Sequence, residues 1–231
     1  MKIKFLLLAL LLAVFGASSA SAAILYAAPA DVGGADCLAP GSACDIAQAL
    51  AAASPGDTII LIAGSYTGAL SNGEFDITKD FLTIEGPNAL IHADGVTDGA
   101  RVAEAVFDGA GYEYIFGIAA HNVTISGIEI DASATEDTWA GIRILPGGWD
   151  RWTIQNNIIS GINDTRYAAA SGVSNFSYGI YGDAQVMTGS LSMTGIIISM
   201  KIRSYGVLRA ERTAISPFST MSTLCPMRAS M

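Results

Sequence analysis

The chain has 231 residues, of which 51% are hydrophobic, and its formal net charge is −9. That is enough apolar material for one domain with a sizeable core. Between residues 23 and 198 there are 20 Asp and Glu but 5 Lys and Arg, whereas residues 199–231 hold 5 basic residues and 1 acidic residue. An acidic body excludes the clustered Lys and Arg of a nucleic-acid-binding surface. It is compatible with calcium binding, or with solubility outside the cell.

The first 22 residues are organised like a secretory signal peptide. Lys2 and Lys4 precede an apolar run of 11 residues, 5–15, and Ala20-Ser-Ala22 supplies a small-residue cleavage site. The run is shorter than the ~20 residues that a membrane-spanning helix needs. We therefore expect a secreted or cell-surface protein that has no membrane association once the signal is cleaved.

Three cysteines follow the leader. Cys37 and Cys44 enclose six residues, and an exported chain folds in a compartment that permits disulfides. We predict that these two cysteines are bonded and fix the loop ahead of the first helix. Cys225 is left over.

A short helix and a strand come next. Asp45 is a suitable N-cap for an alanine-rich helix at residues 46–53, which ends at Ser54-Pro-Gly56. The helix has an apolar face with helical spacing, formed by Ile46, Ala49, Leu50 and Ala53. Residues 58–62 should form a buried strand, and residues 63–66 should turn the chain.

A five-residue phrase then recurs four times, in the order apolar, hydroxyl, apolar, polar, and Gly or Asn. The copies occupy residues 82–86, 123–127, 152–156 and 191–195. Period-2 alternation on both sides of the Gly or Asn predicts a strand, a tight corner and a second strand. Such units bury their apolar side only by stacking, which predicts one column of Ile84, Ile125 and Ile154. Asn157 should bond to neighbouring backbone at an inward corner.

Several short motifs follow one another in an order typical of one superfamily. They are Cys44-Asp-Ile-Ala-Gln-Ala-Leu50, Ser54-Pro-Gly-Asp-Thr-Ile59, Ala63-Gly-Ser-Tyr66 and Val123-Thr-Ile-Ser-Gly127. From Cys37 to about Ile198 the chain thereby resembles right-handed parallel β-helix proteins of the pectate-lyase-like superfamily. The resemblance implies an all-β, right-handed parallel β-helix of four to five coils. An N-terminal capping helix would cover its open end.

We divide the chain into a signal peptide (1–22), an N-terminal loop and capping helix (23–56), β-helix coils (57–198) and an atypical tail (199–231). The tail has no Asp or Asn, reverses the sign of the charge and contains no further copy of the phrase. We interpret it as an out-of-frame or truncated C-terminus. The alternative is an unusual C-terminal cap with a last strand at residues 204–208.

The candidate binding residues surround one predicted strand, residues 141–144, which follows a loop at residues 131–139. Arg143 should point outward from this strand, and Tyr181 in the equivalent strand of the next coil should lie beside it. Trp139 and Trp149 flank the strand, and indole faces suit the apolar faces of sugar rings. We predict that Trp139, Trp149, Arg143 and Tyr181 contact a polysaccharide or a cell-surface glycan.

Acidic residues lie in the same loops. Asp131, Glu136 and Asp137 are candidate calcium ligands, and Asp131, Arg143 and Asp150 are candidate catalytic residues. In the lyases that the chain resembles, calcium acidifies the C5 proton of the sugar, and an Arg or Lys removes it. A glycoside hydrolase would need two carboxyls about 5–9.5 Å apart, for which Asp131 and Asp150 are the first pair to compare. If these residues have no such function, the acids are simply solvated, and Arg143 forms a surface ion pair with Asp131 that is worth ~0–1 kcal/mol.

These observations lead to one hypothesis and one alternative. The hypothesis is an exported, monomeric β-helix protein that binds polysaccharide or serves as a surface adhesive or structural scaffold. The alternative is a calcium-dependent polysaccharide lyase, or a glycoside hydrolase, that acts on an acidic polysaccharide. His92 and His121 are the two histidines of the chain, and we interpret both as loop or corner residues.

Overall fold

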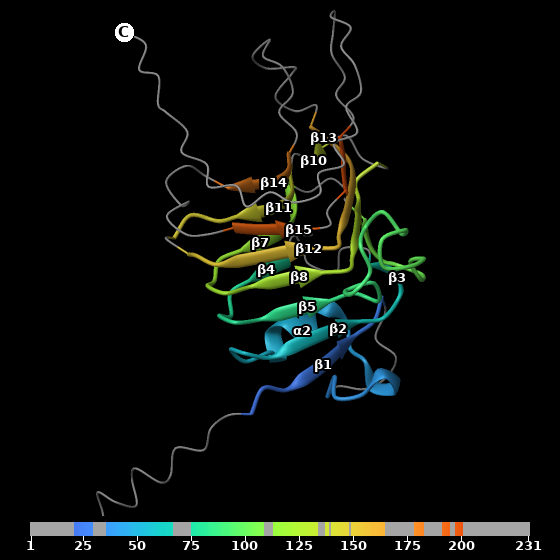
Figure 1. The fold of residues 1–231 in the computed structure, drawn as a ribbon. Coiled ribbons are helices and arrows are strands. Elements are labelled where there is room, and N and C mark those ends of the chain that lie inside the picture. The colour runs from blue at the N-terminus through green and yellow to red at the C-terminus, as the bar shows by residue number, and fades with distance from the viewer. Residues whose placement is uncertain are drawn as a thin grey trace, which may run out of the picture.

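The computed structural model describes residues 21–29, 36–66, 75–108, 113–133, 137–138, 140–147, 149–164, 178–182, 191–194 and 197–200. These residues form three sheets of stacked, mostly parallel strands, with α2 (Ile46–Ala52) as the single α-helix of the described part (Figure 1). The observed structure agrees with the predicted all-β class.

Sheet A contains all four copies of the recurring phrase. Its strands, in spatial order, are β1 (Ile24–Ala27), β2 (Thr58–Leu61), β5 (Thr83–Glu85), β8 (Thr124–Ser126), β12 (Trp152–Gln155) and β15 (Leu191–Thr194). All of these neighbours are parallel. In Figure 1 they lie one above another along the front of the molecule.

Sheets B and C complete the stack. Sheet B contains β3 (Gly64–Tyr66), β6 (Ala105–Asp108), β9 (Glu129–Asp131), β13 (Ile158–Asp164) and β16 (Ile197–Met200), with β10 (Asp137–Thr138) antiparallel to β13. Sheet C contains β4 (Phe75–Ile77), β7 (Tyr114–Ile118), β11 (Ala140–Ile144) and β14 (Tyr178–Gly182). From β2 to β9 the chain visits sheets A, B and C in turn, so each round adds one strand to each sheet.

The shared register brings like residues together in the interior. Ile59, Ile84, Ile125 and Ile154 occupy the same position in adjacent strands of sheet A, and none has measurable solvent exposure. The predicted column of isoleucines is therefore confirmed. Aromatic rings fill the interior between sheets B and C, where Phe107 lies 4.8 Å from the Tyr66 ring and 4.7 Å from the Phe116 ring. These columns give the three sheets one continuous core.

The N-terminal end is closed by α2 and by a disulfide loop. The Asp45 side chain accepts a hydrogen bond from the Gln48 amide at 2.7 Å, which confirms the predicted N-cap. Ile46 and Ala49 of the helix are buried in the core. Cys37 and Cys44 are bonded, with 5.0 Å between their Cα atoms, so the predicted disulfide is also confirmed.

The corner from sheet A to sheet B explains the Gly or Asn that ends the second and third copies of the phrase. Gly127 has φ 68° and Asn156 has φ 57°, a left-handed conformation that these two residue types adopt readily. Asn157 is completely buried, and it accepts from Ile128 N at 3.1 Å and donates to Ile125 O at 2.9 Å. This confirms the predicted bonding of Asn157 to adjacent backbone.

Two predicted segments differ from the structure. Residues 63–66 turn the chain only at their start, where Ala63 is a bend between sheets A and B, because Gly64 to Tyr66 form strand β3. The predicted loop at residues 131–139 contains β10, whose two residues pair with Asn163 and Asp164 of β13. Neither β3 nor β10 was predicted, because strands of two or three residues leave no alternation to detect.

The two ends of the chain were the subject of other predictions. Residues 1–20 of the predicted signal peptide and residues 201–231 of the predicted tail lie outside the described residues. Strand β16 extends to Met200, two residues into the segment assigned to the tail. No helix within the described ranges has the length and hydrophobicity needed to cross a membrane.

Candidate functional site

The outer face of sheet C carries polar and aromatic side chains from neighbouring strands. Its four strands share one outward register position, occupied by Asp76, Gly117, Arg143 and Tyr181. The residues beside this position point inward, since Phe116 and Ile142 are fully buried. The sheet therefore aligns chemically different groups in one row, at a strand spacing of about 4.8 Å.

Arg143 lies at the centre of this row. Its guanidinium carbon is 5.3 Å from the centroid of the Tyr114 ring, which is a cation–π contact. Its Nη1 donates to Glu113 Oε2 over 3.4 Å, and the Tyr114 hydroxyl donates to Asp76 Oδ1 over 3.4 Å. The Arg143 side chain is 23% exposed. These contacts hold a partly sheltered cation against an aromatic ring.

The glycine within the row, Gly117, leaves space for the neighbouring side chains to lie over the sheet. A Cβ atom at Gly117 would overlap the Asp76 carboxylate, and it would lie 2.7 Å from the Tyr114 ring and 3.1 Å from the Leu145 side chain. A larger residue at this position would push these groups apart. Gly117 is therefore required for the present arrangement of Asp76 and Tyr114.

Two more tyrosines extend the row along β14. Tyr181 is the register partner of Arg143, and its ring centroid lies 5.0 Å from that of Tyr178, with 49° between the ring planes. Both tyrosines are partly exposed. Tyrosine combines a large apolar ring with a hydroxyl that donates and accepts hydrogen bonds. We call Tyr114, Arg143, Tyr178 and Tyr181 the Arg–Tyr face. It combines a cation, which lies over the buried Tyr114 ring, with the two partly exposed rings of Tyr178 and Tyr181.

The structure brings together some of the predicted binding residues. Arg143 and Tyr181 are adjacent, as predicted from their equivalent strands. Trp149 instead packs against the core, and its ring meets the His121 ring edge-on, with 5.3 Å between centroids. Trp139 lies outside the described residues. The sequence interpretation missed Tyr114, because β7 contains no copy of the phrase from which its register could be inferred.

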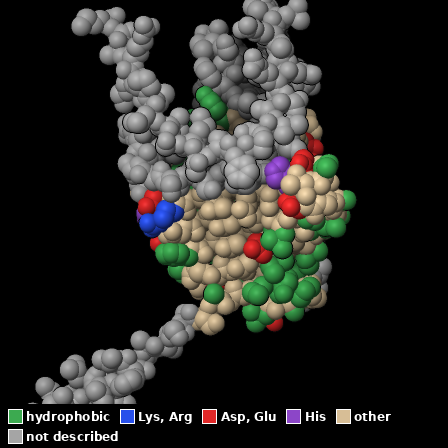
Figure 2. All heavy atoms as spheres, in the orientation of Figure 1, with side chains coloured by type: hydrophobic (Ala, Val, Ile, Leu, Met, Phe, Trp, Pro, Cys, Tyr) green, Lys and Arg blue, Asp and Glu red, His purple; other side chains and the backbone are tan. Residues whose placement is uncertain are grey.

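Asp150 lies at the corner where the chain passes from sheet C to sheet A. Its Oδ1 is 2.6 Å from His121 Nδ1 and 3.4 Å from Arg151 Nη2. Figure 2 shows basic and acidic side chains side by side where the strands of sheet A begin. Asp131, in contrast, ends β9 in sheet B. Asp150 lies before the start of a sheet A strand, whereas Asp131 lies beyond the end of these strands. A strand of four residues such as β12 is about 13 Å long, so the structure does not bring the two aspartates together.

A different pair of carboxylates shares the outer face of sheet B. Glu129 and Asp131 are two residues apart in β9, on either side of the buried Ile130. Partial burial raises the pKa of Glu129 above its usual value, and the nearby charges of Glu104 and Asp131 raise it further. Asp108 is the register partner of Asp131 in the neighbouring strand. In the structure Asp131 therefore has Glu129 and Asp108 as its acidic neighbours, and not the predicted Asp150.

The predicted calcium ligands are only partly described. Asp131 Oδ1 accepts from the Ser133 amide at 2.9 Å, whereas Glu136 and the side chain of Asp137 lie outside the described residues. Within the part that is described, no three His, Cys, Asp or Glu side chains are grouped so that they could hold a metal ion.

Comparison with known proteins does not identify a relative. No family model matches the chain, and no curated protein or solved structure is significantly similar to it.

Proposed function

We propose that this chain is an exported right-handed parallel β-helix protein that binds a polysaccharide along the Arg–Tyr face of sheet C. The observation that carries the proposal is the pairing of Arg143 with Tyr181, with Tyr178 beside Tyr181 and the buried Tyr114 ring against the guanidinium. Sugar rings stack on tyrosine rings through their C–H faces, while their hydroxyls bond to the guanidinium and to carboxylates. The Cys37–Cys44 disulfide supports export to an oxidising compartment.

The charges around Arg143 favour a neutral polysaccharide over an acidic one. Glu113 and Asp76 lie on the same face, and the chain as a whole carries a net charge of −9. A polyuronate would meet this negative field, and the single guanidinium is already partly compensated by Glu113. Neutral sugars carry no such penalty.

Binding to insoluble glycans tests the proposal directly. The purified protein is mixed with cellulose, xylan, chitin and β-glucan, and the bound fraction is measured over a range of salt concentrations. We expect retention on at least one neutral glycan, and a loss of roughly tenfold in affinity for Arg143→Ala or Tyr181→Ala, since each removes a central contact. Arg151→Ala is the matched control, because its side chain is 59% exposed at the corner, away from this face.

Equal binding by Arg143→Ala and the wild type would show that the glycan binds elsewhere. Absence of binding to every glycan by a folded protein would leave a structural scaffold or adhesive as the function.

A second candidate function is glycoside hydrolysis on the outer face of sheet B. Outward residues two apart on a strand lie about 7 Å apart, which is within the range of carboxyl separations in glycosidases. The raised pKa of Glu129 suits a general acid, and Asp131 would act as the base. Release of reducing sugar that Glu129→Gln abolishes would establish this activity, and glycan binding should persist in that variant. A lyase would instead give calcium-dependent absorbance from an unsaturated product.

A further inference from the structure

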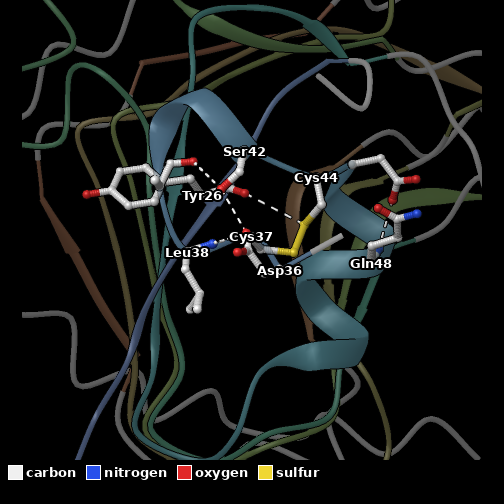
Figure 3. The surroundings of a disulfide bond; sticks show 9 residues. Tyr26, Asp36, Cys37, Leu38, Ser42, Cys44 and Gln48 are labelled. Atoms are coloured by element: carbon white, nitrogen blue, oxygen red, sulfur yellow. Dashed lines mark hydrogen bonds between the residues drawn. A yellow bond between two sulfur atoms is a disulfide. The ribbon is translucent and has the colours of Figure 1, made fainter. Parts of the chain in front are cut away.

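Strand β1 is the edge strand of sheet A, and its outer edge is covered by the disulfide loop. On its inner side β1 pairs with β2. On its outer side, Tyr26 N donates to Cys37 O at 2.7 Å, Cys44 N donates to Tyr26 O at 3.2 Å, and Ala28 N donates to Cys44 O at 2.9 Å. The two cysteines thus supply the backbone groups that satisfy the edge, and their bond holds these groups in place (Figure 3).

Asp36 makes two further hydrogen bonds within this loop. Asp36 Oδ1 accepts from Ser42 Oγ at 2.7 Å and from Leu38 N at 3.2 Å, and these two hydrogen bonds lower the pKa of Asp36. Both bonds are solvent-exposed, and exposed contacts of this kind stabilise weakly. The regular structure of the loop is a single 3-10 turn, Pro40–Ser42. Cys44 is also held by its burial and by α2, which begins at Ile46, so the disulfide matters most for keeping the Cys37 end of the loop against β1.

The covered strand has a composition suited to self-association. Residues 23–28 read Ala-Ile-Leu-Tyr-Ala-Ala, with no charge and no proline. Short segments of high β-propensity and no charge pair with copies of themselves when an edge is free. The outward side chain of Ile24 is 51% exposed, and Leu38 of the loop is 60% exposed. Figure 2 shows hydrophobic side chains gathered at this end of the stack.

We propose that the Cys37–Cys44 loop is an edge cap that prevents β1 from pairing with the β1 strand of a second copy of this chain. Without the disulfide the Cys37 end of the loop is free to leave β1, and a second copy then competes with the loop for Tyr26 N, Tyr26 O and Ala28 N. Two copies related by a two-fold axis satisfy these groups, because one strand then pairs with itself in the antiparallel sense. The cysteines are 1% and 0% exposed, so the bond is protected once it forms. Association is thus confined to chains whose cysteines are still reduced.

The test compares the purified wild type with a Cys37→Ser/Cys44→Ser double variant, using light scattering after size exclusion and sedimentation velocity over a concentration series. We expect a monomeric wild type and a double variant whose association constant is higher by about 10- to 1,000-fold, since backbone groups of both copies form hydrogen bonds across the dimer. Adding Tyr26→Lys to the double variant should restore the monomer, because charges on an edge strand oppose pairing.

A second variant separates edge exposure from loss of stability. Ile46→Ala removes a helix side chain that is 2% exposed but keeps the disulfide and the loop. It should remain monomeric even if it unfolds at a lower temperature than the wild type. The proposal is overturned if the double variant is folded by circular dichroism and stays monomeric. Equal association of Ile46→Ala, or continued association after Tyr26→Lys, overturns it as well.

Discussion

Sheets A and C follow the same parallel register, yet they use it in opposite ways. In sheet A one outward position is threonine in four adjacent strands, Thr58, Thr83, Thr124 and Thr153. In sheet C one outward position holds four different residues, Asp76, Gly117, Arg143 and Tyr181. The same residue recurs in sheet A because each of these strands benefits from the β-propensity of threonine and from its stacking on the next strand. The row in sheet C also places a cation beside an aromatic ring, which is why we propose binding there.

The largest effect should come from the interior of sheet A. Ile125 is fully buried between Ile84 and Ile154. Ile125→Ala should lower the free energy of unfolding by about 2–5 kcal/mol, because it removes buried methyl groups and leaves a cavity. Thr124→Ala, at the neighbouring outward position, should cost about 0.5 kcal/mol or less. Urea denaturation measures both, and equal losses would contradict the assignment of inward and outward faces.

The next largest effect should come from the corner between sheets A and B. Asn157→Ala leaves Ile128 N without its hydrogen-bond partner and removes one bond to Ile125 O, and a buried orphan costs about 1–3 kcal/mol. Asn156→Gly is the matched control, since glycine accepts its positive φ and the variant loses one bond, to Ala89 O. We expect the control to retain most of the stability in thermal denaturation. If both variants were equally stable, Asn157 would not be a structural residue.

The two corners that flank sheet A differ in how far the sequence predicts them. In the corner after sheet A, the left-handed residues Gly127 and Asn156 were foreseeable, because Gly and Asn adopt this conformation readily. The corner before sheet A uses Phe81, Asn122 and Arg151, with φ between 55° and 61°. Phe and Arg do not signal this conformation. Hydrogen bonds between successive corners, such as Phe81 N to His121 O at 2.8 Å, favour this conformation. A local sequence pattern does not reveal such bonds.

The candidate site was predictable only where the repeat extends to it. Arg143 and Tyr181 occupy equivalent positions of similar strands, and their pairing followed from that equivalence. Tyr114 could not be placed, because Ile115 and Phe116 next to it both point into the core. Two successive inward residues break the period-2 rule on which strand faces are assigned. The position of Tyr114 therefore depends on tertiary packing.

A smaller effect on stability is expected on the outer face of sheet C. Arg143→Ala removes a cation–π contact and a long ion pair, so it should cost about 1 kcal/mol in the free energy of unfolding. This loss is well below that of Ile125→Ala, whereas any glycan affinity should fall strongly. Chemical denaturation and glycan retention, measured on the same preparation, separate the two effects. A loss as large as that of Ile125→Ala would place Arg143 among the residues that maintain the fold.

The smallest effect concerns Glu129, and it depends on pH. Its pKa in the folded protein is raised above the ordinary 4.5, so the folded state favours the protonated form. Stability from this residue is therefore fully present below pH 4.5 and is lost as the pH rises through the folded-state pKa. Glu129→Gln keeps a neutral side chain at every pH, so it should stabilise the protein near neutral pH, by less than about 1 kcal/mol because solvent screens the charge. The gain over wild type should vanish at acidic pH, where the wild-type carboxyl is protonated as well. Urea denaturation at several pH values measures this difference, and a gain that does not change with pH would show that ionisation is not its cause. A pH-dependent gain would show that the ionised Glu129 lowers stability, in contrast to the buried isoleucines of sheet A, which raise it.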